Sequence, residues 1–287
     1  MRKIYFKNYY LSFFMNKILN FFRKFFFSFI TNYVLYLTNR IYLKGEYDNW
    51  CFANKICIKG YYSKNIFEKV KKNFILSRKK KNYYERDGIL LRHDYKIVDP
   101  IIKLIKFLGK KKRIDINVFD VGGGMGSIYF KYEDYIKKNK KISWKVYEQK
   151  KIVNFANLNI NEKRLNFTNQ IQRKYKNKFD IILLQSSIQY FPKPFVLLQK
   201  LISLNPMYIV ISETCFSNKQ KIKIQINPNK VSLANYPLYI FNEKKFIYFF
   251  KKKNFLLKDR EYCLTGIGGY QYKSFIFKKN ENKKKKI

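Results

Sequence analysis

The sequence predicts an α/β fold, in which a doubly wound, mostly parallel sheet carries helices on both faces. From residue 113 onward, short apolar runs alternate with segments of helical periodicity, a pattern typical of parallel sheets. A glycine-rich turn at 122–126 joins the first apolar run to the first helix. Near the end, two runs that flank the GIGG sequence at 266–269 predict a hairpin, which would add an antiparallel strand at one edge.

The elements of this domain follow one another in a regular order. Apolar runs predict strands, and amphipathic runs predict helices, one of them with a proline in its first turn. The predicted strands span 116–121, 143–149, 164–169, 179–187 and 207–214, and the predicted helices span 127–138, 151–160, 192–203 and 243–253. Residues 215–241 are predicted to form a long irregular segment.

The whole chain divides into four parts. Residues 1–44 are predicted to be a basic amphipathic N-terminal helical segment, 45–112 a helical cap region, 113–279 the Rossmann-like domain and 280–287 a Lys-rich tail. In the cap region, helices at 65–76 and 95–109 flank a polar and aromatic loop at 83–95.

The N-terminal segment has the pattern of a basic amphipathic helix. Residues 15–38 place apolar side chains at helical spacing from Ile18 to Leu37, while Arg23 and Lys24 fall on other faces. The uninterrupted apolar stretch is shorter than the roughly 20 residues of a membrane span. No small-residue cleavage site of a signal peptide follows it. The sequence leaves open whether this helix lies on an anionic membrane or packs against the domain behind it.

The charge of the chain is extreme, with 61 Lys plus Arg against 19 Asp plus Glu and a net charge of +42. Such a charge suggests nucleic acid or an anionic membrane as a partner. The commonest residues, however, are Lys, Asn, Ile, Phe and Tyr, only ten of the 61 cations are Arg, and the lysines are spread along the chain. This composition is typical of an A+T-rich genome. It disfavours nucleic acid and leaves anionic lipid or sugar as the better-supported partner.

Metal binding is not indicated by the sequence. The cysteines Cys51, Cys57, Cys215 and Cys263 form no CxxC pair, and His93 is the only histidine. A structural zinc site needs four such ligands at short spacing. We therefore expect reduced thiols, no metal and a cytoplasmic location.

The glycine turn VFDVGGGMGS at 118–127 predicts a cofactor cradle at the carboxyl end of the first strand. Glycines permit a positive φ and a close approach of the backbone to a ligand, and the following helix start offers free N–H groups. The cradle glycines are Gly122, Gly123, Gly124 and Gly126. A dinucleotide motif needs a further glycine or alanine where this chain has Ser127, and Asp120 would repel a pyrophosphate.

A carboxylate at this position instead suits S-adenosylmethionine, which carries a sulfonium and an ammonium group. Glu148, at the end of the second strand, can accept hydrogen bonds from both ribose hydroxyls. Ser186, after the fourth strand, is a further candidate contact. The pattern D-x-G-x-G-x-G from Asp120 to Gly126 resembles the first motif of class I S-adenosylmethionine-dependent methyltransferases.

A narrower resemblance covers most of residues 45–278. The segments YERDGILL, VFDVGGGMGSIYF, WKVYEQ, IILLQSSIQYFPKP and ANYPLYIFNEKKF, in this order, resemble a family of bacterial methyltransferases often encoded among surface-polysaccharide genes. This resemblance implies a seven-stranded methyltransferase sheet with added N-terminal helices. It implies as acceptor a sugar, a nucleotide-sugar or a polysaccharide precursor. Relatives tend to carry Asp-Arg after the fifth strand, where this chain has Ser212 and Glu213.

Two residues are candidates for the general base that a sugar hydroxyl needs, His93 before the sheet and Glu213 at the tip of the fifth strand. Either one can instead be structural, His93 as a partly buried ring and Glu213 as a salt-bridged residue. The predicted substrate contacts are Arg86, Asp87, Gln189, Tyr190 and Tyr236. The sequence also leaves open that Arg86 and Asp87 only hold the cap, and that the residues after the fourth strand only cap a helix and pack.

Two other functions stay open at this stage. One is a non-catalytic protein, associated with membrane or glycan, that keeps a relic cofactor fold. The other is an RNA methyltransferase, which the charge suggests. The SSIQ sequence at 186–189 lacks the N/D-PP-Y/F tetrad of the common base-amino methylating enzymes. We expect a cytoplasmic enzyme, with peripheral contact to the inner membrane face.

Overall fold

The computed structural model describes residues 41–57, 60, 63–93, 99–110, 115–139, 141–227 and 234–281. The predicted helix within 15–38 and most of the Lys-rich tail lie outside these ranges. None of the helices in the described ranges is long and apolar enough to cross a membrane.

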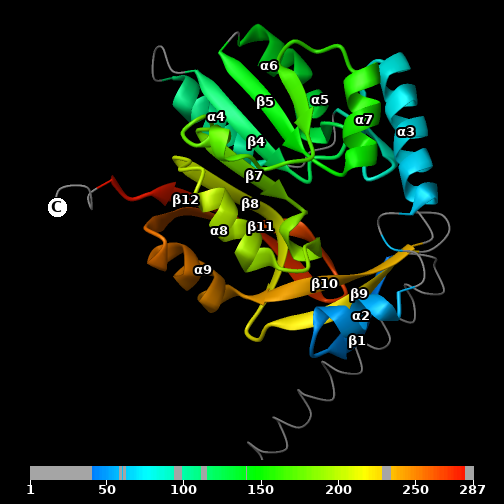
Figure 1. Ribbon diagram of the computed structural model, residues 1–287, viewed down its shortest axis with the longest axis vertical. Coiled ribbons are helices and arrows are strands. Elements are labelled where there is room, and N and C mark those ends of the chain that lie inside the picture. Colours follow the sequence, from blue (N-terminus) through cyan, green and yellow to red (C-terminus); the bar gives the residue numbers. More distant parts are fainter. Residues whose placement is uncertain are drawn as a thin grey trace, which may run out of the picture.

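The sheet has ten strands, and seven of them form its main part, in the order β6-β5-β4-β7-β8-β12-β11 (Figure 1). The other three join it at the end of β8 and are described below. The seven strands of the main part are β4 (Ile116–Val121), β5 (Ile142–Tyr147), β6 (Leu165–Thr168), β7 (Ile181–Gln185), β8 (Tyr208–Ser217), β11 (Phe255–Ile267) and β12 (Tyr270–Lys279). The first five pair in parallel, and β12 pairs antiparallel with both β8 and β11. The predicted doubly wound sheet with a terminal hairpin is confirmed. Its antiparallel strand β12 lies one position inside the edge, which β11 forms.

The strands alternate their side chains between two apolar cores. Val118, Trp144 and Leu183 point into the first core, whereas Phe119 and Ile182 point into the second. Helices α3 (Lys64–Lys79), α4 (Pro100–Gly109), α5 (Ser127–Lys131), α6 (Glu133–Lys138) and α7 (Lys150–Asn159) bury side chains in the first core. Helices α8 (Pro194–Ile202) and α9 (Glu243–Lys252) bury theirs in the second. Both faces of the sheet are therefore covered, as a buried parallel sheet requires.

The cap region is not wholly helical. It contains β1 (Tyr42–Tyr47), α2 (Trp50–Lys55), α3, a two-stranded hairpin of β2 (Tyr83–Arg86) and β3 (Ile89–Arg92), and α4. The predicted loop at 83–95 is thus wrong over its first ten residues. Asp87 and Gly88 both have positive φ, 51° and 74°, as the central residues of a type I′ turn must. The Asp-Gly pair between two apolar runs is the sequence signal of this hairpin.

The segment at 215–241 is also more regular than predicted. Strand β8 continues to Ser217, and β9 (Lys221–Asn227) and β10 (Ala234–Asn242) form an antiparallel hairpin. Strand β1 pairs with β9 at its outer side, and α2 packs on the hairpin, where Trp50 stacks on Tyr239 at 5.0 Å. Figure 1 shows β1, α2 and the β9–β10 hairpin at the lower end of the molecule, beyond the last strands of the main sheet. The period-two alternation KIKIQIN at 221–227 is a strand signal that our prediction overlooked.

Candidate cofactor and acceptor site

The predicted cradle glycines lie together in the turn between β4 and α5. Gly122, Gly124 and Gly126 have φ values of +78°, +59° and +84°, which residues with a Cβ rarely adopt. A Cβ on Gly122 would also lie 2.7 Å from the Cβ of Ser187. The turn therefore needs glycine for its backbone conformation and for its contact with the end of β7.

Asp120 folds its carboxylate over this turn. A Cβ built on Gly123 would lie 2.4 Å from the Oδ2 atom of Asp120, so only glycine leaves room for the carboxylate. The indole Nε1 of Trp144 donates a hydrogen bond of 3.0 Å to the same oxygen. Burial raises the pKa of Asp120 to about 7, against the effect of the Trp144 hydrogen bond and with a smaller contribution from Glu148.

Glu148 brings a second carboxylate to the turn from the neighbouring strand. Strands β4 and β5 pair Val121 with Tyr147, so Glu148 follows beside the glycines. Its Oε2 accepts from the Gly124 N–H at 3.2 Å, and its Oε1 from the Gln149 N–H at 2.8 Å. Burial raises the pKa of Glu148, and these two hydrogen bonds oppose the shift. Two buried carboxylates on adjacent strands thus border one turn.

The end of β7 is fixed against the cradle by Ser187. The Ser187 hydroxyl donates a hydrogen bond of 2.7 Å to the carbonyl of Val121. The predicted contact Ser186 lies beside it with a positive φ of 51°, and its N–H donates to the Ser212 carbonyl at 2.8 Å. The structure therefore brings Ser186 to the cradle, and the hydrogen bond to the backbone of the cradle comes from its neighbour Ser187.

The β2–β3 hairpin reaches the same rim through Arg86. Its guanidinium donates to both carboxylate oxygens of Glu213. The Nη1–Oε1 distance is 3.3 Å, and Nη2 and Oε2 lie closer together. Burial by itself would lower the pKa of Arg86, but the charge and hydrogen bonds of Glu213 raise it. Asp87 is near enough to raise the pKa values of Glu148 and Tyr236. The tip of the hairpin consequently lies near the cradle.

The two candidate bases are placed differently from each other. Glu213, with a strained φ of 48°, is at the predicted rim, but Arg86 occupies both of its oxygens. The ion-paired interpretation is the one that fits this geometry. His93 lies beyond the open end of the hairpin, where its N–H donates to Asn82 and its ring contacts Tyr84 at 5.7 Å. Three strand residues, roughly 10 Å, separate that end from Arg86.

A wall of tyrosines and amides faces the cradle from the β9–β10 hairpin and the 3-10 turn η2 (Ile188–Tyr190). The hydroxyl of Tyr190 donates to Gln225 Oε1 at 2.8 Å, and Gln225 Nε2 donates to the Tyr236 hydroxyl at 3.1 Å. Asn227 Nδ2 donates to the same hydroxyl at 2.8 Å. The rings of Tyr190 and Tyr236 meet edge to face at 5.3 Å. The predicted contacts Tyr190 and Tyr236 are thus brought together, and Gln225 and Asn227 join them.

The groups of this wall are electrically neutral. Burial raises the pKa values of Tyr190 and Tyr236, and of Tyr272 in β12, well above the ordinary tyrosine value. Neighbouring tyrosines and Cys215 add to the effect for Tyr190 and Tyr272. All three phenols therefore keep their protons at neutral pH.

Among the predicted substrate contacts, Gln189 has the most unusual environment. Its side chain has no exposed surface, and neither its Nε2 nor its Oε1 has a hydrogen-bond partner in the described structure. Most buried amides in folded proteins are paired, so this one is an exception that calls for a cause.

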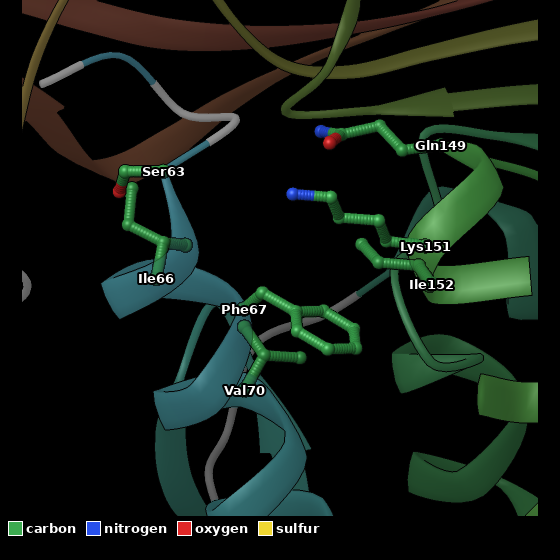
Figure 2. Close-up of a pocket in the computed structure, with 7 residues that line it drawn as sticks. All are labelled: Ser63, Ile66, Phe67, Val70, Gln149, Lys151 and Ile152. Atoms are coloured by element: carbon green, nitrogen blue, oxygen red, sulfur yellow. The ribbon is translucent and has the colours of Figure 1, made fainter.

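A small open cleft lies between α3 and the start of α7. Figure 2 shows Phe67 of α3 facing Ile152 of α7 across it, while Gln149 and Lys151 extend from the α7 side. The cleft borders the cradle because Gln149 directly follows Glu148. No group of three His, Cys, Asp or Glu that could hold a metal ion occurs among the residues whose structure is described.

The strand order, the antiparallel β12 and the glycine turn after β4 together define a Rossmann-like class I methyltransferase fold. No known family model matches the chain. No curated protein matches it either.

Solved structures of similar shape include three methyltransferases. Magnesium protoporphyrin IX methyltransferase from Synechocystis PCC 6803, with bound SAH, is 11% identical, with a TM-score of 0.47 over 77% of this chain and 96% of that one. A SAM-dependent methyltransferase from Methanosarcina mazei is 14% identical, with a TM-score of 0.46 over 64% and 98%. The 1,6-didemethyltoxoflavin-N1-methyltransferase of Burkholderia thailandensis is 15% identical, with a TM-score of 0.44 over 63% and 76%.

Proposed function

We propose that this protein transfers a methyl group from S-adenosylmethionine to a small or glycan-type acceptor. The observation that carries the proposal is the pair of buried carboxylates, Asp120 and Glu148, at the glycine turn. Two acids at this position disfavour a pyrophosphate and favour a ligand that is cationic and rich in hydroxyl groups. The sulfonium, the ammonium and the ribose diol of S-adenosylmethionine meet this requirement.

The residues present fit that cofactor. The bare backbone of Gly122 to Gly124 permits close approach, and Asp120 and Glu148 supply acceptors for N–H and O–H groups. When bound there, the cofactor supplies an electrophilic methyl group.

The protein contributes position and exclusion of water. The hairpin tip at Asp87, held by the Arg86–Glu213 ion pair, lies near the cradle. The tyrosine and amide wall also faces it. Holding the acceptor oxygen in line with the methyl group and away from water is the main requirement of such a transfer.

The proposed acceptor is a sugar, a nucleotide-sugar or a surface-polysaccharide precursor. Its support is the neutral, hydrogen-bonding character of the wall, which suits hydroxyl groups. Peripheral contact with an anionic membrane through residues 15–38 stays a prediction, since these residues lie outside the described ranges. Liposome flotation of the full chain, with and without that segment, tests it.

Calorimetry with S-adenosylmethionine and its demethylated product tests the proposed cofactor. We expect micromolar or tighter binding to the wild type, and roughly 10- to 100-fold weaker binding for Glu148→Ala, which removes charge-assisted acceptors. Glu68→Ala, at an exposed acid on α3, is the matched control and should leave the affinity unchanged. No heat with either compound, on protein that unfolds cooperatively, would refute the proposal.

Binding without transfer to any acceptor would favour the relic-fold alternative. An RNA methyltransferase would instead show an RNA affinity that falls steeply with salt, because phosphate contacts release counterions. Filter binding over a range of salt concentrations separates that alternative from a sugar acceptor.

A further inference from the structure

The unpaired amide of Gln189 is the strongest unexplained feature of the site. The side chain is fully buried in η2, and both ends of its amide lack a hydrogen-bond partner in the described structure. A buried donor or acceptor without a partner destabilises a fold, and native structures contain few of them. Gln189 leaves one donor group and one acceptor unpaired on the same planar amide.

The position of Gln189 places this amide between the cradle and the wall. Two residues earlier, Ser187 binds the Val121 carbonyl beside the glycine turn. One residue later, the Tyr190 hydroxyl binds Gln225 of the wall. The Gln189 amide lies close enough to the Tyr190 hydroxyl to affect its pKa, but no contact meets hydrogen-bond geometry. Gln189 therefore lies between a residue bound to the cradle and a residue of the wall, and its amide is next to the Tyr190 hydroxyl.

The surrounding groups are neutral or mutually neutralised. Gln225, Asn227 and Tyr236 bind one another through uncharged hydrogen bonds. Among the described residues of this rim, the cation Arg86 is bound by the carboxylate of Glu213 and lies 3.8 Å from that of Asp87. An anionic acceptor would find no unbound cation among these residues, whereas hydroxyl groups can both donate and accept.

We propose that the Gln189 amide recognises the methyl acceptor, and that this acceptor is an uncharged sugar ring with two neighbouring hydroxyls. One hydroxyl accepts from Nε2 and the other donates to Oε1, while the ring packs on the tyrosines of the wall. This inference rests on the proposed function, because it assigns the acceptor side of the same site.

The stability of two matched variants gives a test that needs no ligand. Gln189→Met removes both unpaired groups at nearly equal volume, so the free protein should unfold at a temperature roughly 2–4 °C higher. Gln225→Met makes the same change at a buried amide whose groups are all paired. It removes the acceptor of the Tyr190 hydroxyl and the donors to Asn227 Oδ1 and the Tyr236 hydroxyl, and should lower that temperature. Destabilisation by Gln189→Met would overturn the proposal, since it would show that this amide is satisfied within the fold.

The second test uses tritiated S-adenosylmethionine and methyl glycosides of hexoses, 6-deoxyhexoses and N-acetylhexosamines. Uronic acids and sugar phosphates of the same configurations form the charged set. We expect label in the neutral set and at least a tenfold lower kcat/KM with the charged set. Gln189→Met should lose roughly 10- to 100-fold in kcat/KM with the neutral sugars, through the loss of two hydrogen bonds.

Binding of the demethylated cofactor, measured by calorimetry on the same samples, separates the two proposals. If cofactor binding is retained and the neutral sugars stay unlabelled, or the charged set is preferred, this inference is wrong and the proposed cofactor stands. If cofactor binding is absent in the wild type, the proposed function itself is wrong. Unchanged cofactor affinity in Gln189→Met, together with the loss of sugar labelling, is the result we expect.

Discussion

Arg86 and Glu213, which are 127 residues apart in the sequence, form an ion pair that involves both carboxylate oxygens. Their side chains are only 14% and 10% exposed, so the pair is largely removed from water. It connects the β2–β3 hairpin to β8, directly at the rim of the candidate site. The left-handed φ of Glu213, at 48°, indicates that its backbone is strained and is held in this conformation by the surrounding structure.

Breaking this pair from one side should strongly destabilise the fold. Arg86→Met leaves the carboxylate of Glu213 buried without a partner, and we expect a loss of about 2–4 kcal/mol in the free energy of unfolding. Urea titration followed by circular dichroism measures it. Lys103→Met, which breaks the exposed Lys103–Glu261 pair, should cost no more than about 1 kcal/mol. Equal effects of both variants would show that the Arg86 pair is no more than a surface contact.

The close contact between Gly123 and the Asp120 carboxylate predicts that the effect of Gly123→Ala on stability depends on the side chain at position 120. Gly123→Ala places a Cβ against the Asp120 carboxylate, so we expect a loss of about 1–3 kcal/mol in stability and much weaker cofactor binding. In an Asp120→Ala background the same change should cost almost nothing in stability, because the obstructing carboxylate is gone. A double-mutant cycle from urea titrations measures this coupling.

The matched control for this cycle is Gly109→Ala, at the end of α4. A Cβ there meets no atom within 4 Å, and its φ lies outside the left-handed region. That variant should be neutral or slightly stabilising, because alanine favours helix more than glycine does. A Gly123→Ala cost that persists without the Asp120 carboxylate would mean that the backbone, and not the side-chain contact, requires glycine.

Much of the fold could be predicted because its signals are local. The strands from Ile116 to Ser217 that form the parallel core are apolar runs long enough to be recognised alone, and the glycine turn marks the first strand–helix junction. Asp120 and Glu148 could be predicted as neighbours for the same reason, because they lie at the ends of two adjacent parallel strands. Two hairpins have equally local sequence signals, Asp87-Gly88 and the alternation at 221–227. Our prediction missed both because it assigned the segments around them to loops.

The remaining features of the site depend on tertiary contacts. No local pattern indicates that Arg86 reaches Glu213 across 127 residues, or that Tyr190 binds Gln225 of a separate hairpin. The unpaired state of the Gln189 amide is likewise a property of packing. The sequence named four members of this set as candidates, Arg86, Glu213, Gln189 and Tyr190, without showing which residues they contact. Residue type suggested these candidates, and the fold shows which of them contact one another.

Two buried carboxyl groups predict an unusual dependence of stability on pH. Burial raises the pKa of Glu85 to about 8 and that of Asp120 to about 7, from 4.5 and 3.8 for the free groups. Between about pH 4 and 8 the folded protein therefore binds more protons than the unfolded chain. Stability is fully present below pH 4 for these two groups and is lost as the pH rises through 7 to 8. Each group contributes a slope of up to about 1.4 kcal/mol per pH unit.

Glu85→Gln isolates one of these two contributions. The variant keeps an oxygen to accept from the Gly88 N–H, a bond of 2.7 Å, but it cannot ionise. We expect its free energy of unfolding to fall less steeply than that of the wild type between pH 5.5 and 8.5, and to exceed the wild-type value at pH 8.5. Urea titrations at four pH values measure both slopes, with Glu68→Gln, at an exposed acid, as the control. Parallel curves for wild type and Glu85→Gln would show that Glu85 titrates normally, and hence that water reaches this carboxyl group in the folded protein.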